Sequence, residues 1–378
     1  MPTEPGDNPP ADARQGAADL ASVRILRLAL GTALALWFSQ AVGWSLSFIA
    51  PIFTLLLLAT PMPAPKLKGA VAIVVLVTLA AYGGLLLLPL LLHQTVAGIL
   101  ILSLALFYSF YFTSRGGNAV LGTLITVSLT LTAAVGSVSV DAVLAVAQGV
   151  SIGALVGMAF VWIAHALLPD PRSVEQTAAT PAMAEGSVTP VVASMARRSA
   201  LRSLAIVLPV VILLLYSPSS AGYIAVMIKV TSMTQQVNTS KTREAAASLL
   251  LSTLIGGIAA LAAWMILGIW PLLTLYTLLI ALAALLMGRR IFMGNGMAAQ
   301  SATWSYAYLT MIIILAPAVM DSLTGSSAGL AFLDRLAMFA GATAYGVVAV
   351  YIFDAFWPGE KRRDQHGPLL PAAIADVR

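Results

Sequence analysis

Long apolar runs, separated by short polar or turn-forming segments, are the feature that most limits how this chain can fold. Of its 378 residues, 60% are hydrophobic and only 9% are charged, a composition far from that of soluble globular domains. Each run has about 16 to 25 residues, enough for a helix to cross a bilayer core. The sequence therefore predicts an all-α polytopic membrane protein with about twelve transmembrane helices. The predicted spans are residues 24–43, 46–62, 68–92, 94–113, 117–137, 142–168, 200–217, 221–237, 244–269, 271–288, 296–318 and 328–357.

A polar segment at residues 170–197 separates the first six runs from the last six. It is rich in Pro, Ser, Thr, Ala and Glu, with too little apolar surface to pack or to span. We therefore predict that this cytoplasmic linker joins two six-helix membrane repeats, at residues 23–169 and 198–358. Cytoplasmic tails are predicted at residues 1–22, which are expected to be disordered, and at residues 359–378. The first tail is polar and lacks the apolar run of a secretory signal peptide.

Basic residues fall in every second loop between the predicted spans, as the positive-inside rule requires if the spans are real. They are Arg24 and Arg27, Lys66 and Lys68, Arg115, the linker group Arg172, Arg197, Arg198 and Arg202, then Lys241 and Arg243, Arg289 and Arg290, and Lys361, Arg362 and Arg363. Both termini are thus predicted to be cytoplasmic. The net charge of +5 encodes orientation and is no signal for nucleic-acid binding.

The two halves share a spacing of basic residues, which suggests a parallel internal repeat. An offset of 175 residues relates three pairs, namely Arg27 and Arg202, Lys66 and Lys241, and Lys68 and Arg243. Positive-inside pressure alone would also produce some such matches. If the repeat is real, a pseudo-two-fold axis along the membrane normal relates the halves, and a pathway belongs between them.

Lys229 lies deep within the predicted span 221–237. A charge at that depth costs several kcal/mol on insertion scales unless it is paired or faces water, so it marks a functional site by default. Steps of three or four residues place small and polar side chains on one helical stripe, made of Gly222, Ala225, Lys229, Ser232 and Gln236. We predict that this stripe lines an aqueous cavity in which Lys229 attracts an anionic substrate. The alternative is a buried ion pair within one bundle, with the small residues serving close helix packing.

Pro51 interrupts the second predicted span of the first half, and Thr54 in that span is the offset equivalent of Lys229. A proline inside a helix removes a backbone donor and is expected to break or kink it, which frees a carbonyl for a ligand or water. Interrupted spans at matching places in two repeats point to a binding site in secondary transporters. Pro51 is therefore a candidate binding-site residue.

Gln300, Trp304 and Tyr308 recur at steps of four and form an aromatic, hydrogen-bonding face suited to planar organic ligands. The first half has a polar counterpart without aromatic residues, made of Thr123, Thr126, Ser128, Thr130 and Thr132. The alternative for any one of these residues is interfacial anchoring or helix packing through hydroxyl groups.

Asp334 and Arg335 lie about one turn inside the last predicted span, at its non-cytoplasmic end. Adjacent residues on a helix do not face each other, so separate partners are expected. A desolvated carboxylate here would carry protons, as a proton-driven exporter requires. The alternative is anchoring at the level of the lipid headgroups.

Enzyme signatures are missing from the sequence. It has no Gly-rich phosphate loop followed by Lys-Ser/Thr, no His-Glu-x-x-His and no Gly-x-Ser-x-Gly. Cysteine is absent and the three histidines are scattered, which argues against a metal site. We therefore expect neither an enzyme nor a cofactor.

Several segments resemble the membrane domain of the fusaric-acid-resistance and aromatic-acid-exporter (FUSC-like) family. In the first half they are Arg24-Ile-Leu-Arg27, Trp44, Phe48-Ile-Ala-Pro51 and Lys66-Leu-Lys68-Gly69, and in the second half they are Arg202, Gly222-Tyr-Ile-Ala-Val, Lys241-Thr-Arg243 and Leu254-Ile-Gly256-Gly257. The chain resembles a short branch of that family without the large cytoplasmic domain. The resemblance implies a bacterial inner-membrane exporter of aromatic or other weak organic acids that works with a periplasmic membrane-fusion adaptor and an outer-membrane channel.

The leading hypothesis is thus a proton-gradient-driven exporter of organic anions or related toxic compounds. Its expected site comprises Lys229, Ser232, Gln236, Gln300, Trp304, Tyr308 and Pro51, with Asp334 and Arg335 in coupling. One alternative is a passive organic-anion channel, since the segments also resemble plant organic-anion channels. A second is a non-transporting membrane scaffold. The sequence leaves oligomerisation open.

Overall fold

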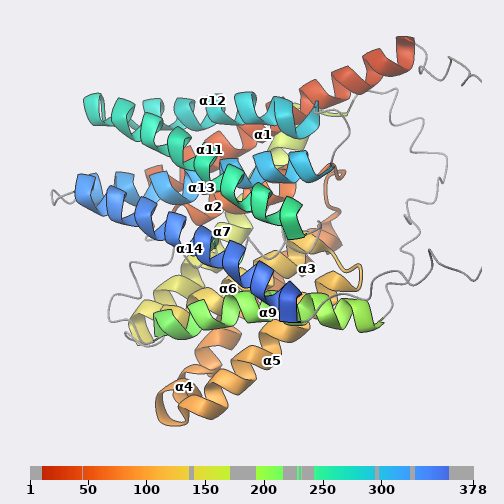
Figure 1. Cartoon of the computed structure of the whole chain (residues 1–378). Helices are drawn as coiled ribbons and strands as arrows, with labels where there is room; N and C mark the ends of the chain where they lie inside the picture. The colour runs from red at the N-terminus through yellow and green to blue at the C-terminus, as the bar shows by residue number, and fades with distance from the viewer. Residues whose placement is uncertain are drawn as a thin grey trace, which may run out of the picture.

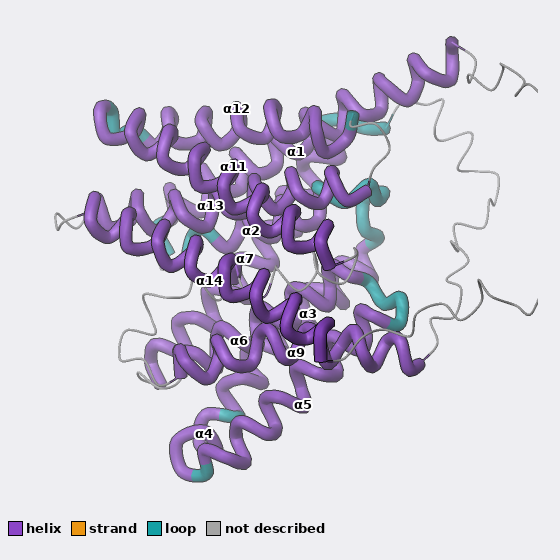
Figure 2. Tube along the Cα trace, viewed as in Figure 1, coloured by secondary structure: helices purple, strands orange, loops and turns teal. Residues whose placement is uncertain are grey.

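The computed structural model describes residues 11–44, 46–135, 140–170, 193–215, 228–229, 231, 242–293, 298–323 and 328–356. Within these ranges every element of regular secondary structure is an α-helix. Most of the helices run across the view in Figures 1 and 2, packed side by side in one bundle. The expectation of an all-α chain is confirmed for the described residues.

The helices of the first half are α1 (Ala11–Val42), α2 (Ile49–Leu58), α3 (Leu67–Leu86), α4 (Leu88–His93), α5 (Thr95–Ser114), α6 (Ala119–Val135) and α7 (Val140–Leu167). Those of the second half are α9 (Ala193–Leu215), α11 (Thr242–Ile269), α12 (Leu273–Phe292), α13 (Ala298–Leu323) and α14 (Ala328–Phe356). Each overlaps a predicted span, with α3 and α4 sharing one, although α1 begins at Ala11, within the tail that was expected to be disordered. The predicted span 221–237 lies almost wholly outside the described residues.

Eight helical segments in the described part of the chain are long and apolar enough to cross a membrane. They correspond to eight of the twelve predicted spans, while α2 and the Ala119–Leu131 part of α6 are shorter apolar helices. Several of the eight turn large apolar side chains outward, as α5 does with Val96, Leu100 and Leu104. Apolar surface of this extent is rare on soluble monomers, and the helices fit a multi-pass membrane protein.

α2 is a short helix enclosed by the bundle. It has 10 residues, and nine of them are buried. At about 1.5 Å per residue it extends roughly 15 Å, half of a hydrocarbon core of about 30 Å. The apolar run 46–62 therefore forms a buried half-span, shorter than the crossing helix that its length suggested.

Pro51 stands in the first turn of α2, which begins at Ile49. Backbone N–H groups in a first turn have no intrahelical partner, so proline is tolerated there without distortion. Of the break or kink that was expected at Pro51, the structure shows no kink inside a helix. The interruption takes the form of a helix start, preceded by turns in which Ser47 N–H donates to the Trp44 carbonyl and Ile49 N–H to the Leu46 carbonyl.

Three glycines on one face of α7 allow α2 to pack closely against it. A Cβ added to Gly149 would lie 2.9 Å from Leu46 Cβ, and one added to Gly153 would lie 2.7 Å from Ile49 Cγ2. At Gly157 it would lie 2.8 Å from Phe53 Cβ. Small residues at steps of four are a common way to bring membrane helices together.

Helix pairs of the first half recur in the second. α3 packs against α6 and α7, and α11 packs against α13 and α14. α1 contacts α7, and α9 contacts α14. Between the halves, α1 packs against α12 while α5 packs against α9, so the first helix of each half meets the fourth helix of the other.

Candidate functional site

Lys229 is fully enclosed by protein, with 1% of its surface exposed. Its Nζ donates a hydrogen bond to Thr310 Oγ1 on α13 at 2.8 Å. Thr310 Oγ1 in turn donates to the Tyr306 carbonyl at 2.7 Å, so the hydroxyl points its lone pairs at the ammonium group. A chain of two hydrogen bonds therefore links Lys229 to the backbone of α13.

A close crossing of α11 and α13 holds Thr310 in place. A Cβ added to Gly256 on α11 would collide with the Ala307 carbonyl oxygen and lie 2.6 Å from Thr310 Cβ. Glycine at this crossing lets the two backbones approach, as small residues do in membrane helix pairs. The partner of Lys229 is thus fixed by packing.

A chamber of about 250 Å³ opens between α2, α6 and α13. Its walls combine apolar side chains with hydroxyl groups and consist of Leu55, Leu56, Ala59, Thr60, Pro61, Ala119, Val120, Thr123, Ser301, Ala302, Ser305, Tyr306 and Leu309. Two walls come from the first half and one from the second. The chamber lies toward the end of the bundle that carries Lys66, Arg115 and Arg290, which we call the basic end. Its size and mixed lining suit a small amphipathic ligand.

A small apolar void lies next to the chamber. Ile228, the neighbour of Lys229, lines this void together with residues of α2, α6 and α7. Leu56, Thr123 and Leu309 line both the void and the chamber. Leu309 also precedes Thr310, the partner of Lys229. The void therefore borders both the chamber and the segment that carries the buried lysine.

The predicted face of Gln300, Trp304 and Tyr308 does not line the chamber. Gln300 is exposed, and Trp304 lies under the Arg290 guanidinium, with 5.7 Å from Cζ to the ring centroid. Tyr308 is buried, where its hydroxyl is 2.7 Å from Thr32 Oγ1 and donates to the Ile280 carbonyl at 3.2 Å. This face of α13 therefore turns toward α12 and α1.

The chamber is lined by the neighbouring face of α13, which presents Ser301, Ser305 and Tyr306. These residues follow the predicted ones by one or two positions, and each position turns a helix by about 100°. The polar stretch is therefore where the sequence indicated, but the residues that line the chamber are the neighbours of the predicted ones. In the first half Thr123 lines the chamber, and it belongs to the polar counterpart that the sequence predicted.

The other candidate residues are not gathered around the chamber. Pro51 is buried within α2. Asp334 is exposed on α14, while Arg335 is half-buried. Ser232 and Gln236 lie outside the described residues. The roles of these residues stay predictions.

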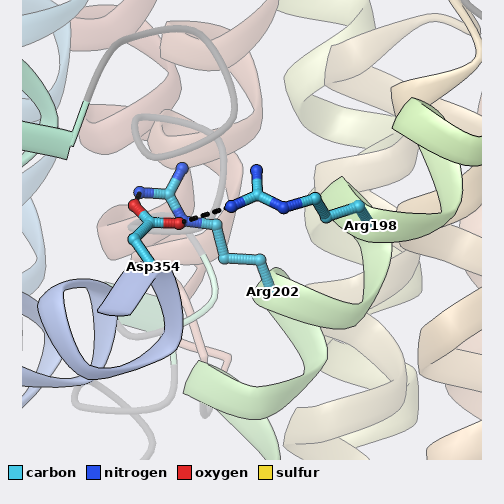
Figure 3. A network of polar contacts seen from close by, with 3 residues as sticks. All are labelled: Arg198, Arg202 and Asp354. Atoms are coloured by element: carbon cyan, nitrogen blue, oxygen red, sulfur yellow. Dashed lines mark hydrogen bonds and ion pairs between the residues drawn. The ribbon is translucent and has the colours of Figure 1, made fainter. Parts of the chain in front are cut away.

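Three ion pairs at the basic end, two of which share Asp354, were not identified as a site from the sequence. Arg27 Nη2 is 2.8 Å from Asp170 Oδ1, joining α1 to the residues after α7. Arg202 Nη2 is 2.6 Å from Asp354 Oδ2, joining α9 to α14, and Arg198 Nη2 is 3.1 Å from the other oxygen of Asp354. Figure 3 shows both arginines reaching this carboxylate.

Arg27 and Arg202 are related by the offset of 175 residues, and in each half the arginine meets an aspartate near the end of the sixth predicted span. The matching positions of Arg27 and Arg202 in the two halves were therefore the sequence signal that could have indicated these ion pairs. The positive-inside rule explained the same arginines without assigning a partner. In the described ranges, no group of three or more His, Asp or Glu side chains has the arrangement of a metal site.

The first half of the chain is similar to a family of known sequence but undescribed activity. Residues 24–164 match a family model described as "Protein of unknown function (DUF2955)". The match extends from α1 to α7, so it includes the α2 and α6 walls of the chamber but not Lys229 or α13. No curated protein and no solved structure matches the chain. The FUSC-like resemblance therefore stays a prediction.

Proposed function

We propose that the protein exports organic anions across the bacterial inner membrane, with the chamber between α2, α6 and α13 as part of the pathway. The observation that carries this proposal is the buried Lys229, whose neighbour Ile228 lines a void that shares three side chains with a chamber whose walls come from both halves. An intramembrane ionisable side chain usually marks a substrate or ion pathway. The chamber provides room for an amphipathic solute, and the lysine provides the attraction for its negative charge.

We infer further that the halves are two parallel six-helix repeats, which would make twelve spans with cytoplasmic termini. The matched helix pairs support this inference, because α1 on α12 and α5 on α9 exchange under a two-fold operation. The basic loops at one end support the orientation of the termini. In such an arrangement the chamber lies near the pseudo-two-fold axis, where transporters place their sites.

Lys229 is suited to a carboxylate substrate. An ammonium group is a compact charge, and an ion pair in a low-dielectric interior is much stronger than the same pair in water. Thr310 orients the ammonium at 2.8 Å and offers no competing negative charge. We propose that displacement of the Leu56, Thr123 and Leu309 side chains admits the substrate from the chamber to Lys229.

A transport assay on Lys229 variants tests the proposal. Cells that carry wild type or Lys229→Met are compared for efflux of a panel of monocyclic aromatic carboxylates at equal expression. Lys229→Met keeps the length of the side chain and removes its charge, and the loss of a charged hydrogen bond predicts a roughly 10- to 100-fold slower efflux. Lys229→Arg is expected to retain part of the activity.

The matched control is Lys66→Met, which removes an exposed lysine at the basic end. It is expected to leave efflux unchanged. Equal efflux by wild type and Lys229→Met would remove the proposed role of Lys229. Equal losses in Lys229→Met and Lys66→Met would point to an effect of net charge on expression or insertion.

A passive organic-anion channel is the second candidate, and the exposure of Asp334 favours it. Proton coupling needs a carboxylate whose protonation is linked to the pathway, whereas Asp170 and Asp354 are held by arginines. Flux in vesicles that follows the membrane potential, ignores a proton gradient and survives Asp334→Asn would establish the channel. Uphill efflux that fails in Asp334→Asn would establish coupling through Asp334, with Arg335 as its neighbour.

A periplasmic membrane-fusion adaptor and an outer-membrane channel are proposed partners on the strength of the FUSC-like resemblance. Co-purification of the full chain with an adaptor from the same cell envelope tests this part separately. A channel or a self-sufficient transporter would retain its flux in vesicles that contain only this protein.

A further inference from the structure

An apolar groove runs along the outer surface of the bundle between α1 and α12, which lie together in Figure 1. It has a volume of about 640 Å³. Small side chains make it hollow, with Ala29 and Ala33 in one wall and Ala281 in the other. Both walls belong to helices that are long and apolar enough to cross a membrane, and Leu26, Trp37 and Leu278 in these walls are exposed, so a bilayer around the bundle would place lipid at the groove.

The groove is elongated along the helices. Its α12 wall extends from Thr274 to Leu285, a rise of about 17 Å at 1.5 Å per residue. That is more than half of a hydrocarbon core of about 30 Å. A long, narrow, apolar ligand lying along the membrane normal fills such a groove, whereas a compact solute does not. In a bilayer, phospholipid acyl chains have this shape.

The basic end of the groove carries a free cation. Arg289 follows Leu285 by four residues, so it continues the same face of α12. Its side chain is exposed, and it forms no ion pair with any residue in the described part of the chain. The adjacent Arg290 turns instead to Trp304. α1 closes this end where Ile25 Cγ2 would lie 3.2 Å from a Cβ added to Gly288.

We propose that the α1–α12 groove binds an anionic phospholipid, with an acyl chain along the groove and the headgroup phosphate at Arg289. Basic side chains just inside the cytoplasmic surface attract anionic lipids, and the apolar groove adds burial of the chain. The occupant is bound at the junction of the two halves, since α1 belongs to the first and α12 to the second. This site is separate from the chamber and from Lys229.

Native mass spectrometry of the full chain tests the proposal, after reconstitution in nanodiscs of phosphatidylethanolamine and phosphatidylglycerol at a three-to-one ratio. Wild type is expected to retain phosphatidylglycerol in excess of that ratio. Arg289→Gln is expected to lower the retained phosphatidylglycerol about fivefold, which is the contribution of one basic side chain to the affinity for an anionic lipid surface. Arg290→Gln is the matched control and is expected to retain as much as wild type.

A second pair of variants separates the groove from the charge. Ala281→Phe and Ala33→Phe fill the groove from opposite walls and are expected to abolish retention of both lipids. Ala340→Phe fills a comparable apolar groove of about 410 Å³ between α11 and α14 and serves as the control. Circular dichroism and thermal unfolding verify that each variant is folded.

Several results would overturn the proposal. The first is wild-type retention in both Ala281→Phe and Ala33→Phe. The second is an equal loss in Arg289→Gln and Arg290→Gln, which would mean a diffuse electrostatic effect. The third is a change of oligomeric mass on filling the groove with lipid retention unchanged, which would assign the groove to a second copy of the chain. The test does not measure efflux, so its result is independent of the proposed function.

Discussion

Two positions related by the same offset, Thr54 and Lys229, behave differently in the folded chain. Thr54 on α2 is buried, and its hydroxyl lies 2.9 Å from the Ala50 carbonyl of its own helix and 3.3 Å from the Gly157 carbonyl of α7. Lys229 is equally buried, and its amino group donates to the Thr310 hydroxyl at 2.8 Å. The contacts of Thr54 satisfy a neutral hydroxyl with backbone carbonyls, as threonines commonly do in helices. Lys229 instead places a cation in the interior, which a stable fold does not need.

The ion pairs at the basic end, unlike the buried lysine, occur in both halves. Arg27 meets Asp170 in one half, and Arg202 meets Asp354 in the other, so a similar contact occurs twice. A feature found in both halves belongs to the frame that holds each bundle together. A feature found in one half, such as Lys229, is unnecessary for the frame. The difference is the physical reason to assign function to Lys229 and stability to the arginines.

The largest effect is expected when the Thr54 position is given a lysine, as at position 229. Thr54→Lys adds a cation next to the Gly157 carbonyl, where α2 and α7 leave no space for a longer side chain. An uncompensated buried charge costs about 3 to 5 kcal/mol or more. We expect loss of folded protein, measured as the monodisperse fraction in detergent. A folded and stable Thr54→Lys variant would mean that the interior is wet and that Lys229 is not special.

The frame contacts give the next largest effect. Asp354→Asn removes the carboxylate shared by Arg198 and Arg202, leaving two arginines without it at a half-buried place. We expect a loss of about 2 kcal/mol in unfolding free energy, below the full value for a buried pair because solvent reaches the site. Detergent unfolding titrations measure it. Efflux by the folded fraction is expected to be unchanged. A transport defect without loss of folded protein would instead assign Asp354 to the transport pathway.

Close packing of α2 provides a third test of the frame. Gly157→Ala places a methyl group 2.8 Å from Phe53 Cβ, so α2 must shift, at a cost of about 1 to 2 kcal/mol. Gly341→Ala on α14 is the matched control, because an added Cβ there meets nothing within 4 Å. That substitution is expected to stabilise the helix by roughly 0.5 to 1 kcal/mol. Thermal unfolding of both variants gives the comparison, and equal shifts would contradict the packing argument.

The spans could be predicted from the sequence because length and hydropathy are local properties. The bounds of α5 and α12 agree with the predicted runs to within a few residues. The same criterion overestimated the length of α2. Its apolar run is enclosed by other helices, and the helix itself has 10 residues. Hydropathy records that a segment avoids water but does not distinguish lipid from protein interior.

The site was only partly predictable, since it depends on which helix faces which. The sequence indicated that Lys229 is buried and that α13 has a polar part, but the rotation of α13 is set by its contacts with α12 and α11. Tyr308 was assigned to a ligand face and instead bonds Thr32 across the halves. The repeated Arg27 and Arg202 were visible in the sequence, whereas the aspartates that they meet lie far away along the chain.

The finest test of the comparison is Thr310→Val, which keeps the shape of the side chain and removes the acceptor for Lys229. Removal of one hydrogen bond to a charged group costs about 1 to 3 kcal/mol when its partner stays buried. If Lys229 serves only packing, Thr310→Val lowers stability and Lys229→Met restores it, because the double variant no longer buries an amino group that has lost its hydrogen bond to the Thr310 hydroxyl. If Lys229 serves transport, the double variant is stable but still fails to export. Unfolding and efflux measured on the two single variants and the double variant therefore separate the two roles, and a double variant that exports at the wild-type rate would assign the lysine to the frame.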